Sequence, residues 1–220
     1  MPMRDFVATW LRESRTARWT LIGLGALLVL GAAAFGGYSW YGAQDTRARL
    51  ALVAAADLAQ QATAPGAPAE ARDKALRALE TVLTEHPRFS GAPEAAYRLA
   101  NLRLDAGQHA AARGAYEIAI AKGATGTLRS LAALGIAYSW EGQRDYARAQ
   151  AAFQAALNGL SSKDFLYEEM LLGLGRAQEF GGNPAAARET YSRLLKERPD
   201  TRRADDIRSR LASLPAPPKQ

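Results

Sequence analysis

The chain has 220 residues, and its 48% hydrophobic and 23% charged content lies in the range of globular proteins. Much of the apolar content is alanine, which favours closely packed helices. The net charge is +6, but acidic and basic residues are interspersed, without the basic face and interleaved aromatics of a nucleic-acid-binding protein. The chain has no cysteine, which excludes disulfides, thiolate metal sites and cysteine nucleophiles.

Residues 1–18 are predicted to be a basic segment on the cytoplasmic side of a membrane. Phe6, Val7, Trp10 and Leu11 fall on one helical face, and arginines follow them. This pattern favours a short interfacial helix on an anionic leaflet, and a frayed tail is the alternative.

Residues 19–41 contain no charge and are predicted to be a transmembrane helix. At about 1.5 Å rise per residue they cross a hydrocarbon core of roughly 30 Å. Trp19 lies at one end, and Trp40 and Tyr41 lie at the other, which is typical of aromatic belts at two interfaces. More arginines precede the run than follow it, so the positive-inside rule predicts a cytoplasmic N-terminus and a remaining chain outside the cytoplasm.

A cleaved signal peptide is the alternative to an uncleaved anchor. The small residues Ala32, Ala33 and Ala34 follow an apolar stretch and match a cleavage site. The apolar run continues beyond them and ends in aromatics, which favours the anchor. Residues 42–70 are predicted to be a helical connector and loop, because a helical pattern to Gln61 is followed by two prolines and a glycine.

Residues 71–214 contain a repeated helical unit. Each unit has a small residue, an aromatic or leucine four positions later, and an apolar residue three positions after that, which marks one face of a helix. The units are Ala75/Leu79/Val82, Ala112/Tyr116/Ala119, Ala149/Phe153/Ala156 and Ala187/Tyr191/Leu194. The last three units follow a helical segment with a Leu-small pair and a glycine-containing turn. This repetition predicts an all-α solenoid of helical hairpins, closed by a capping helix at 201–214 and followed by a disordered tail at 215–220.

These repeats resemble the tetratricopeptide repeat (TPR) family. The last unit carries the resemblance best, with Leu171, Leu174, Gly175, Gly182, Ala187, Tyr191, Leu194 and Pro199 on the 34-residue register of that family. The middle unit departs from it, because two extra residues lie between Gly142 and Ala149 and a longer loop follows at 158–164.

The resemblance implies that partners bind on a concave face lined by the first helix of each hairpin. The candidates on the family register are Tyr97, Asn101, Asp105, Arg129, Ile136, Trp140, Arg176, Glu179 and Phe180. Aromatic residues and arginine are enriched in protein interfaces. The alternative is that Trp140 and Phe180 seal the core between repeats. Asn101 matches one position of the basic clamp that some TPR proteins use for a C-terminal carboxylate, but Tyr97 stands where a lysine is expected, so the ligand type is not inherited.

No catalytic, cofactor-binding or metal-binding residues are predicted. His86 and His109 have no ligand-like partner at helical spacing. The Gly173-Leu174-Gly175 sequence lacks the third glycine and the preceding strand of a dinucleotide loop, and favours close helix packing instead. We therefore predict a protein-binding module that is not an enzyme, with no nucleic-acid partner and no small-molecule substrate.

The layout of a basic N-terminus, one apolar helix and a repeat domain resembles the ancillary subunit of the bacterial SecYEG translocon (YfgM-like). Local matches are Arg4-Asp5-Phe6 before the apolar run and the segment 37–41 at its end. This resemblance implies a bacterial inner-membrane protein with a periplasmic TPR domain, which assists secretion and transfers clients to periplasmic chaperones.

A second resemblance implies a different role. Segments 83–87 and 195–201 look like parts of the TPR domain associated with the Tol–Pal envelope system, which would make the chain an adaptor of envelope or cell-division machinery. This hypothesis depends on cleavage after Ala34. A third hypothesis, a regulator of an enzyme, predicts a cytoplasmic partner bound through residues 1–18.

Overall fold

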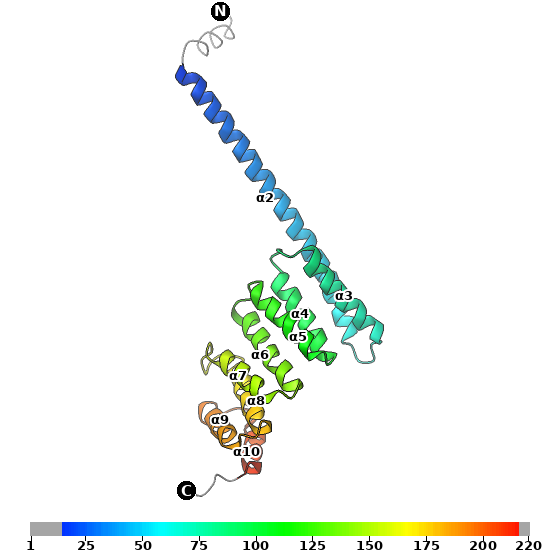
Figure 1. Ribbon diagram of the computed structural model, residues 1–220, viewed down its shortest axis with the longest axis vertical. Coiled ribbons are helices and arrows are strands. Elements are labelled where there is room, and N and C mark those ends of the chain that lie inside the picture. The colour runs from blue at the N-terminus through cyan, green and yellow to red at the C-terminus, as the bar shows by residue number, and fades with distance from the viewer. Residues whose placement is uncertain (1–14, 216–220) are drawn as a thin grey trace, which may run out of the picture. The chain divides into compact units, whose positions relative to one another are not determined.

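The computed structural model describes residues 15–215, and within this range the chain is all-helical, which confirms the predicted fold class (Figure 1). The predicted interfacial helix before Arg15 and the predicted tail after Pro215 lie outside the described residues. The chain divides into two compact units, Met1–Arg47 and Ala48–Gln220, and helix α2 (Arg15–Ala62) contributes to both.

The first unit contains the apolar part of α2. Large side chains along it are exposed, among them Trp19, Leu28, Phe35 and Trp40. Within Ile22–Ala62, an 18-residue window has a mean hydropathy of 1.7, so this helix is long and apolar enough to cross a membrane. No other helix among residues 15–215 meets these criteria.

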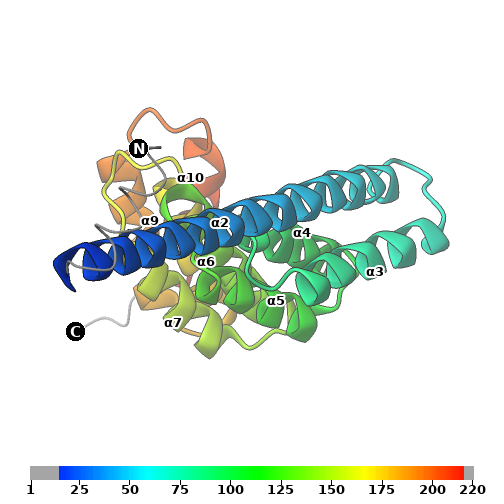
Figure 2. The same ribbon diagram turned by 90° about the horizontal axis from the view of Figure 1, so that it is seen from above.

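The second unit begins with a hairpin formed by the C-terminal end of α2 and helix α3 (Ala69–Glu85), which are joined by a short loop (Figure 2). Four residues of α2 are buried in the same core cluster as the first repeated unit: Ala48, Leu52, Ala55 and Ala62. Their spacing places them on one face of the helix. The segment 42–70 was predicted to be a helical connector and loop. Part of it packs in the solenoid core.

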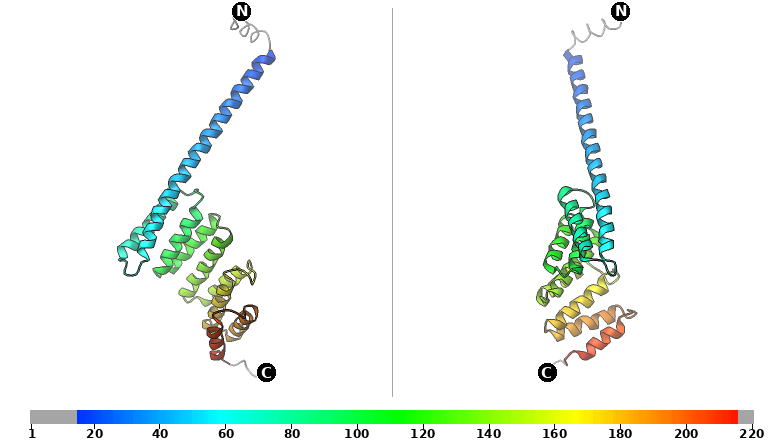
Figure 3. Two further views of the ribbon diagram at one scale, coloured as in Figure 1. Left: turned by 180° about the vertical axis from the view of Figure 1, so that it is seen from behind. Right: turned by 90° about the vertical axis from the view of Figure 1, so that its right-hand side faces the viewer.

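The solenoid continues through seven further helices, which pack on their chain neighbours and are joined by short turns or loops (Figure 3). They are α4 (Ala92–Asp105), α5 (His109–Ala121), α6 (Gly126–Gly142), α7 (Tyr146–Leu157), α8 (Tyr167–Phe180), α9 (Pro184–Glu197) and α10 (Ala204–Ser213). Helix α6 also contacts α4 and α8, so it lies within the row of helices rather than at its end.

Large aromatic side chains fit against glycines of neighbouring helices and hold the hairpins together. A Cβ atom on Gly135 would lie 2.2 Å from the Tyr116 ring, and one on Gly175 would lie 2.3 Å from the Tyr191 ring. A Cβ atom on Gly173 would lie 2.4 Å from the Phe153 ring. The structure therefore confirms that the Gly173-Leu-Gly175 sequence serves helix packing.

The turn between α6 and α7 spans residues 143–145 and is no longer than the turns at 106–108 and 181–183, so the two extra residues expected between Gly142 and Ala149 are not an insertion in this turn. Gly107 and Gly182 adopt positive φ angles of 72° and 76° in the turns of the hairpins before and after it. In the middle turn, between α6 and α7, Arg144 has φ 60°, a conformation that costs a residue with a side chain roughly 1 kcal/mol. The carboxylate of Asp145 accepts a hydrogen bond from the Arg148 backbone N–H and caps α7 directly after this turn.

Candidate functional site

The nine residues predicted to line one binding face have different surroundings in the structure. Tyr97 and Asn101 pack against α5. The Tyr97 and Tyr116 rings lie 5.8 Å apart, and the Tyr116 hydroxyl donates a hydrogen bond of 2.6 Å to Asn101 Oδ1. Burial raises the pKa of Tyr116, which keeps the hydroxyl protonated as the donor. Asp105 is exposed and, with Asn101, lines a hollow between α4 and residues 56–63 of α2.

Arg176 forms a bidentate ion pair with Glu141 that joins α8 to α6. Its Nε and Nη2 atoms donate hydrogen bonds of 2.9 and 2.8 Å to the two carboxylate oxygens. The side chains of Arg176 and Glu141 are only 22% and 17% exposed. The hydrogen bonds from Arg176 to Glu141 raise the pKa of the guanidinium, so the pair stays charged.

A second carboxylate extends this network. The Tyr138 hydroxyl of α6 donates to Glu169 of α8, and Arg203 donates to the same carboxylate. Burial by itself would raise the pKa of Glu169, but these hydrogen bonds outweigh it and lower the pKa below its usual value of 4.5. The charges between α6 and α8 are therefore neutralised by partners within the fold.

Glu179 is also bound by partners within the fold. It accepts a hydrogen bond of 2.8 Å from the Tyr191 hydroxyl of α9, and Arg210 of α10 approaches to 3.3 Å. Phe180 is 54% exposed, and its ring lies 5.9 Å from the Tyr146 ring. It borders a shallow hollow at the turn between α6 and α7, which also includes Arg144.

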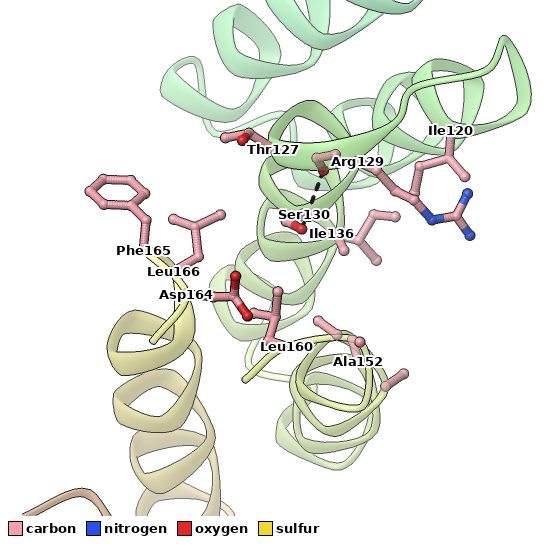
Figure 4. Close-up of a pocket in the computed structure, with 15 residues that line it drawn as sticks. Ile120, Thr127, Arg129, Ser130, Ile136, Ala152, Leu160, Asp164, Phe165 and Leu166 are labelled. Atoms are coloured by element: carbon pink, nitrogen blue, oxygen red, sulfur yellow. Dashed lines mark hydrogen bonds between the residues drawn. The ribbon is translucent and has the colours of Figure 1, made fainter. Parts of the chain in front are cut away.

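Arg129 and Ile136 line a groove on another side of α6. We call this the α6 groove, and its lining residues are Ile120, Gly126, Thr127, Arg129, Ser130, Ala133, Ile136, Ala152, Ala155, Ala156, Gly159, Leu160, Asp164, Phe165 and Leu166 (Figure 4). Its volume is about 800 Å³. Arg129 and Ile136 were predicted from the sequence, but the contribution of α7 and the loop after it was not.

Most side chains that line the α6 groove are small or branched and apolar. The alanines of α7, Ala152 among them, contribute only small side chains, while Leu160 and Phe165 come from the loop between α7 and α8 (Figure 4). Phe165 stands at the edge and is 86% exposed. Exposed aromatic side chains of this kind are favoured at protein interfaces.

The loop that borders the groove is fixed by Asp164. Its Oδ2 atom accepts hydrogen bonds of 2.5 Å from the Ser161 backbone N–H and 2.8 Å from the Ser161 hydroxyl. These hydrogen bonds lower the pKa of Asp164 and keep it ionised. The insertion noted at 158–164 in the sequence is therefore a structured wall of the groove.

Arg129, Ile136 and Trp140 lie on the same face of α6, at positions i, i+7 and i+11. The Arg113 guanidinium lies 3.4 Å from the centroid of the Trp140 ring, and the Arg148 guanidinium lies 4.6 Å from it. Guanidinium groups are attracted to the faces of aromatic rings. Trp140 therefore holds two cations, one from α5 and one from α7.

Helical spacing shows that the Trp140 stack continues the α6 groove. Arg113 is seven residues before Ile120 on α5, and Arg148 is seven residues before Ala155 on α7. From Arg129 to Trp140 the face of α6 is roughly 16 Å long at 1.5 Å per residue. One face of α6 thus carries an apolar floor with cations at both ends.

The described residues also show whether side chains are placed for metal binding. Between Arg15 and Pro215, no group of three or more His, Cys, Asp or Glu side chains is placed to hold a metal ion. The Nδ1 atom of His109 is buried without a hydrogen-bond partner, and the His109 ring packs directly against Gly142. This contact is a packing feature at the start of α5.

Comparisons with known proteins agree on the architecture. The family model for the tetratricopeptide repeat matches residues 142–211. No curated protein matches the chain. Among solved structures, the chain is similar to TPR-like repeats of a putative kinesin light chain from Podosopora anserina, with a TM-score of 0.58, 16% identity, and coverage of 76% of this chain and 84% of the other.

Two further solved structures show the same fold. A MamA protein has a TM-score of 0.55 and 16% identity, with 76% of this chain and 79% of the other covered. PilF from Pseudomonas aeruginosa has a TM-score of 0.53 and 19% identity, with 75% and 68% covered. The family model and these structures support the tetratricopeptide assignment made from the sequence.

Proposed function

We propose that this chain is a membrane-anchored scaffold that binds other proteins through the α6 groove and assists secretion or periplasmic chaperone transfer near the SecYEG translocon. The tetratricopeptide fold indicates a protein–protein interaction scaffold, and such repeats are generally not enzymes. The observation that carries the choice of site is the 86% exposure of Phe165 beside an apolar groove of about 800 Å³.

The proposed location is the bacterial inner membrane, with the N-terminus in the cytoplasm and the solenoid in the periplasm. It is supported by the uncharged run 19–41, by the arginines that precede it, and by the exposure of its large apolar side chains. The secretion role is supported by the resemblance in layout to the ancillary translocon subunit.

Affinity purification of the full chain from membranes in mild detergent tests this proposal. The matched variants are Ala155→Glu, which places a charge in the α6 groove, and Gln154→Glu, which places one on the neighbouring exposed position outside it. We expect translocon subunits or periplasmic chaperones with the parent chain and with Gln154→Glu, and much weaker recovery with Ala155→Glu. Equal recovery with both variants would show that the groove is not the binding site.

Mass spectrometry of the N-terminus in the same sample tests the anchor. An intact N-terminal segment supports the uncleaved membrane helix. A mature N-terminus at Phe35, together with Tol–Pal or division proteins, would instead support the adaptor role that the segments 83–87 and 195–201 suggest.

A further inference from the structure

We infer that the α6 groove selects an extended partner segment with bulky apolar residues in the middle and an acidic residue near each end. This inference rests on the proposed protein-binding function and specifies the chemistry of the partner. It follows from the order of charged and apolar side chains along one face of α6.

The arginine at one end of the groove is available to a ligand. Arg129 of α6 is exposed, lines the groove, and has no ion-pair partner among residues 15–215. A guanidinium in this position offers several N–H donors to a carboxylate in a fixed planar arrangement.

The other end holds one arginine without a carboxylate partner among residues 15–215 and one that is paired. Arg113 uses its Nη1 atom in a 2.8 Å hydrogen bond to the neutral side chain of Gln143. Arg148 forms an ion pair of 3.5 Å with Asp145, and its side chain is 65% exposed. Both guanidinium groups lie close to the Trp140 ring, a contact that does not neutralise their charge.

The acidic residues nearby offset part of this charge. Asp145 pairs with Arg148, and Asp164 lines the groove as a carboxylate that accepts two hydrogen bonds from Ser161. Glu117 is exposed on α5, but it does not line the groove. Arg129 and Arg113 keep no carboxylate partner among residues 15–215, and these two arginines favour an acidic ligand.

The middle of the groove is apolar and sets the spacing of the ligand. Ile120, Ile136 and Leu160 line the groove. Burying one large aliphatic or aromatic side chain there removes apolar surface from water on both sides. An extended segment rises about 3.3 Å per residue, so roughly 16 Å between the two ends corresponds to acidic residues about five positions apart.

Selection from a displayed library of random ten-residue peptides tests the inference, with the full chain in nanodiscs as bait. We expect enrichment of peptides with Asp or Glu about five positions apart around Leu, Ile or Phe. Labelled copies of the enriched peptides should bind Arg129→Gln about tenfold more weakly, as loss of one charge-assisted contact implies. Arg208→Gln, an exposed arginine of α10, serves as the matched control and should bind like the parent chain.

Enrichment without acidic residues, or equal affinity for parent and Arg129→Gln, would overturn the inference. Failure of the two proposals is distinguishable. If the library yields no acidic peptides but Ala155→Glu still abolishes recovery of partners from membranes, the function stands and the partner chemistry is wrong. If acidic peptides bind the groove but Ala155→Glu changes no partner, the chemistry stands and the proposed function is wrong.

Discussion

Arginines of neighbouring helices meet α6 on two sides, and the two sides differ in whether the arginine pairs with a carboxylate. On the side that faces α8, Arg176 is bound by both oxygens of Glu141 in a half-buried pair. On the groove side, Arg113 lies over the Trp140 ring and donates to a neutral glutamine. Both sides contain Arg and aromatic residues, but Arg176 is paired with a half-buried carboxylate, whereas Arg113 has no carboxylate partner among residues 15–215.

The difference separates residues that stabilise the solenoid from residues that are available to a partner. Removing one member of a half-buried ion pair leaves an unpaired charge in a poorly solvated place. Removing an arginine from an aromatic ring loses a weaker contact, and the charge it carried was never neutralised. Composition alone does not predict this division of roles.

The largest expected effect follows from breaking the ion pair. Arg176→Ala should lower the free energy of unfolding by about 2–4 kcal/mol, because Glu141 is left without its partner. Arg113→Ala should cost no more than about 1 kcal/mol, the range of one cation–π contact. Urea unfolding of the full chain in detergent, followed by circular dichroism, measures both values.

A double-mutant cycle with Glu141→Ala provides the control. The double variant should be less destabilised than the sum of the two single variants, because the two side chains interact directly. Equal destabilisation by Arg176→Ala and Arg113→Ala would remove the contrast between the two sides of α6.

The next effect concerns the pH dependence of the same network. The pKa of Glu169 is lowered in the folded chain, so its ionised form stabilises the fold above the unfolded pKa, and this contribution is lost as the pH falls through the folded pKa. Glu169→Gln should therefore be less stable than the parent at pH 7, by about 1–3 kcal/mol.

Urea titrations at a series of pH values check this prediction. The difference between the parent and Glu169→Gln should shrink as the pH falls below 4.5. A difference that stays constant down to pH 2 would mean that the carboxylate charge does not contribute through Tyr138 and Arg203.

The smallest effect on stability is expected in the groove. Phe165→Ser should change the free energy of unfolding by less than about 0.5 kcal/mol, because the side chain is exposed. Recovery of partners from membranes should fall several-fold, since exposed aromatics at an interface contribute strongly to affinity. Ser162→Ala, in the same exposed loop, is the control. Unchanged recovery would exclude the groove edge from the interface.

The repeats were predictable because their signal is local. Leu79, Tyr116, Phe153 and Tyr191 recur at helical spacing with small residues, and all four are buried in the structure. The contribution of residues 48–62 was missed because this part of α2 follows the apolar run without a turn signal, although Ala48, Leu52 and Ala55 have the spacing of the repeated unit.

The site was only partly predictable because it depends on contacts between repeats. Trp140 and Arg176 were placed on one predicted surface by the family register. In the structure Arg176 instead pairs with Glu141, which is 35 residues away in the sequence. The twist between hairpins decides this pairing, and no pattern within one repeat contains it. The longer loop at 158–164 was visible in the sequence, and its departure from the register was the available signal for the groove wall.

Site-specific photo-crosslinking in living cells tests the central claim most directly, that the groove side of α6 is the surface that meets a partner. A photoreactive residue replaces either Ala155, which lines the α6 groove, or Gln154, its exposed neighbour on α7 outside the groove. We expect a defined partner to be crosslinked at position 155 and little or none at position 154. Equal crosslinking at both positions, or crosslinking at position 154 alone, would contradict a binding surface on the groove side of α6.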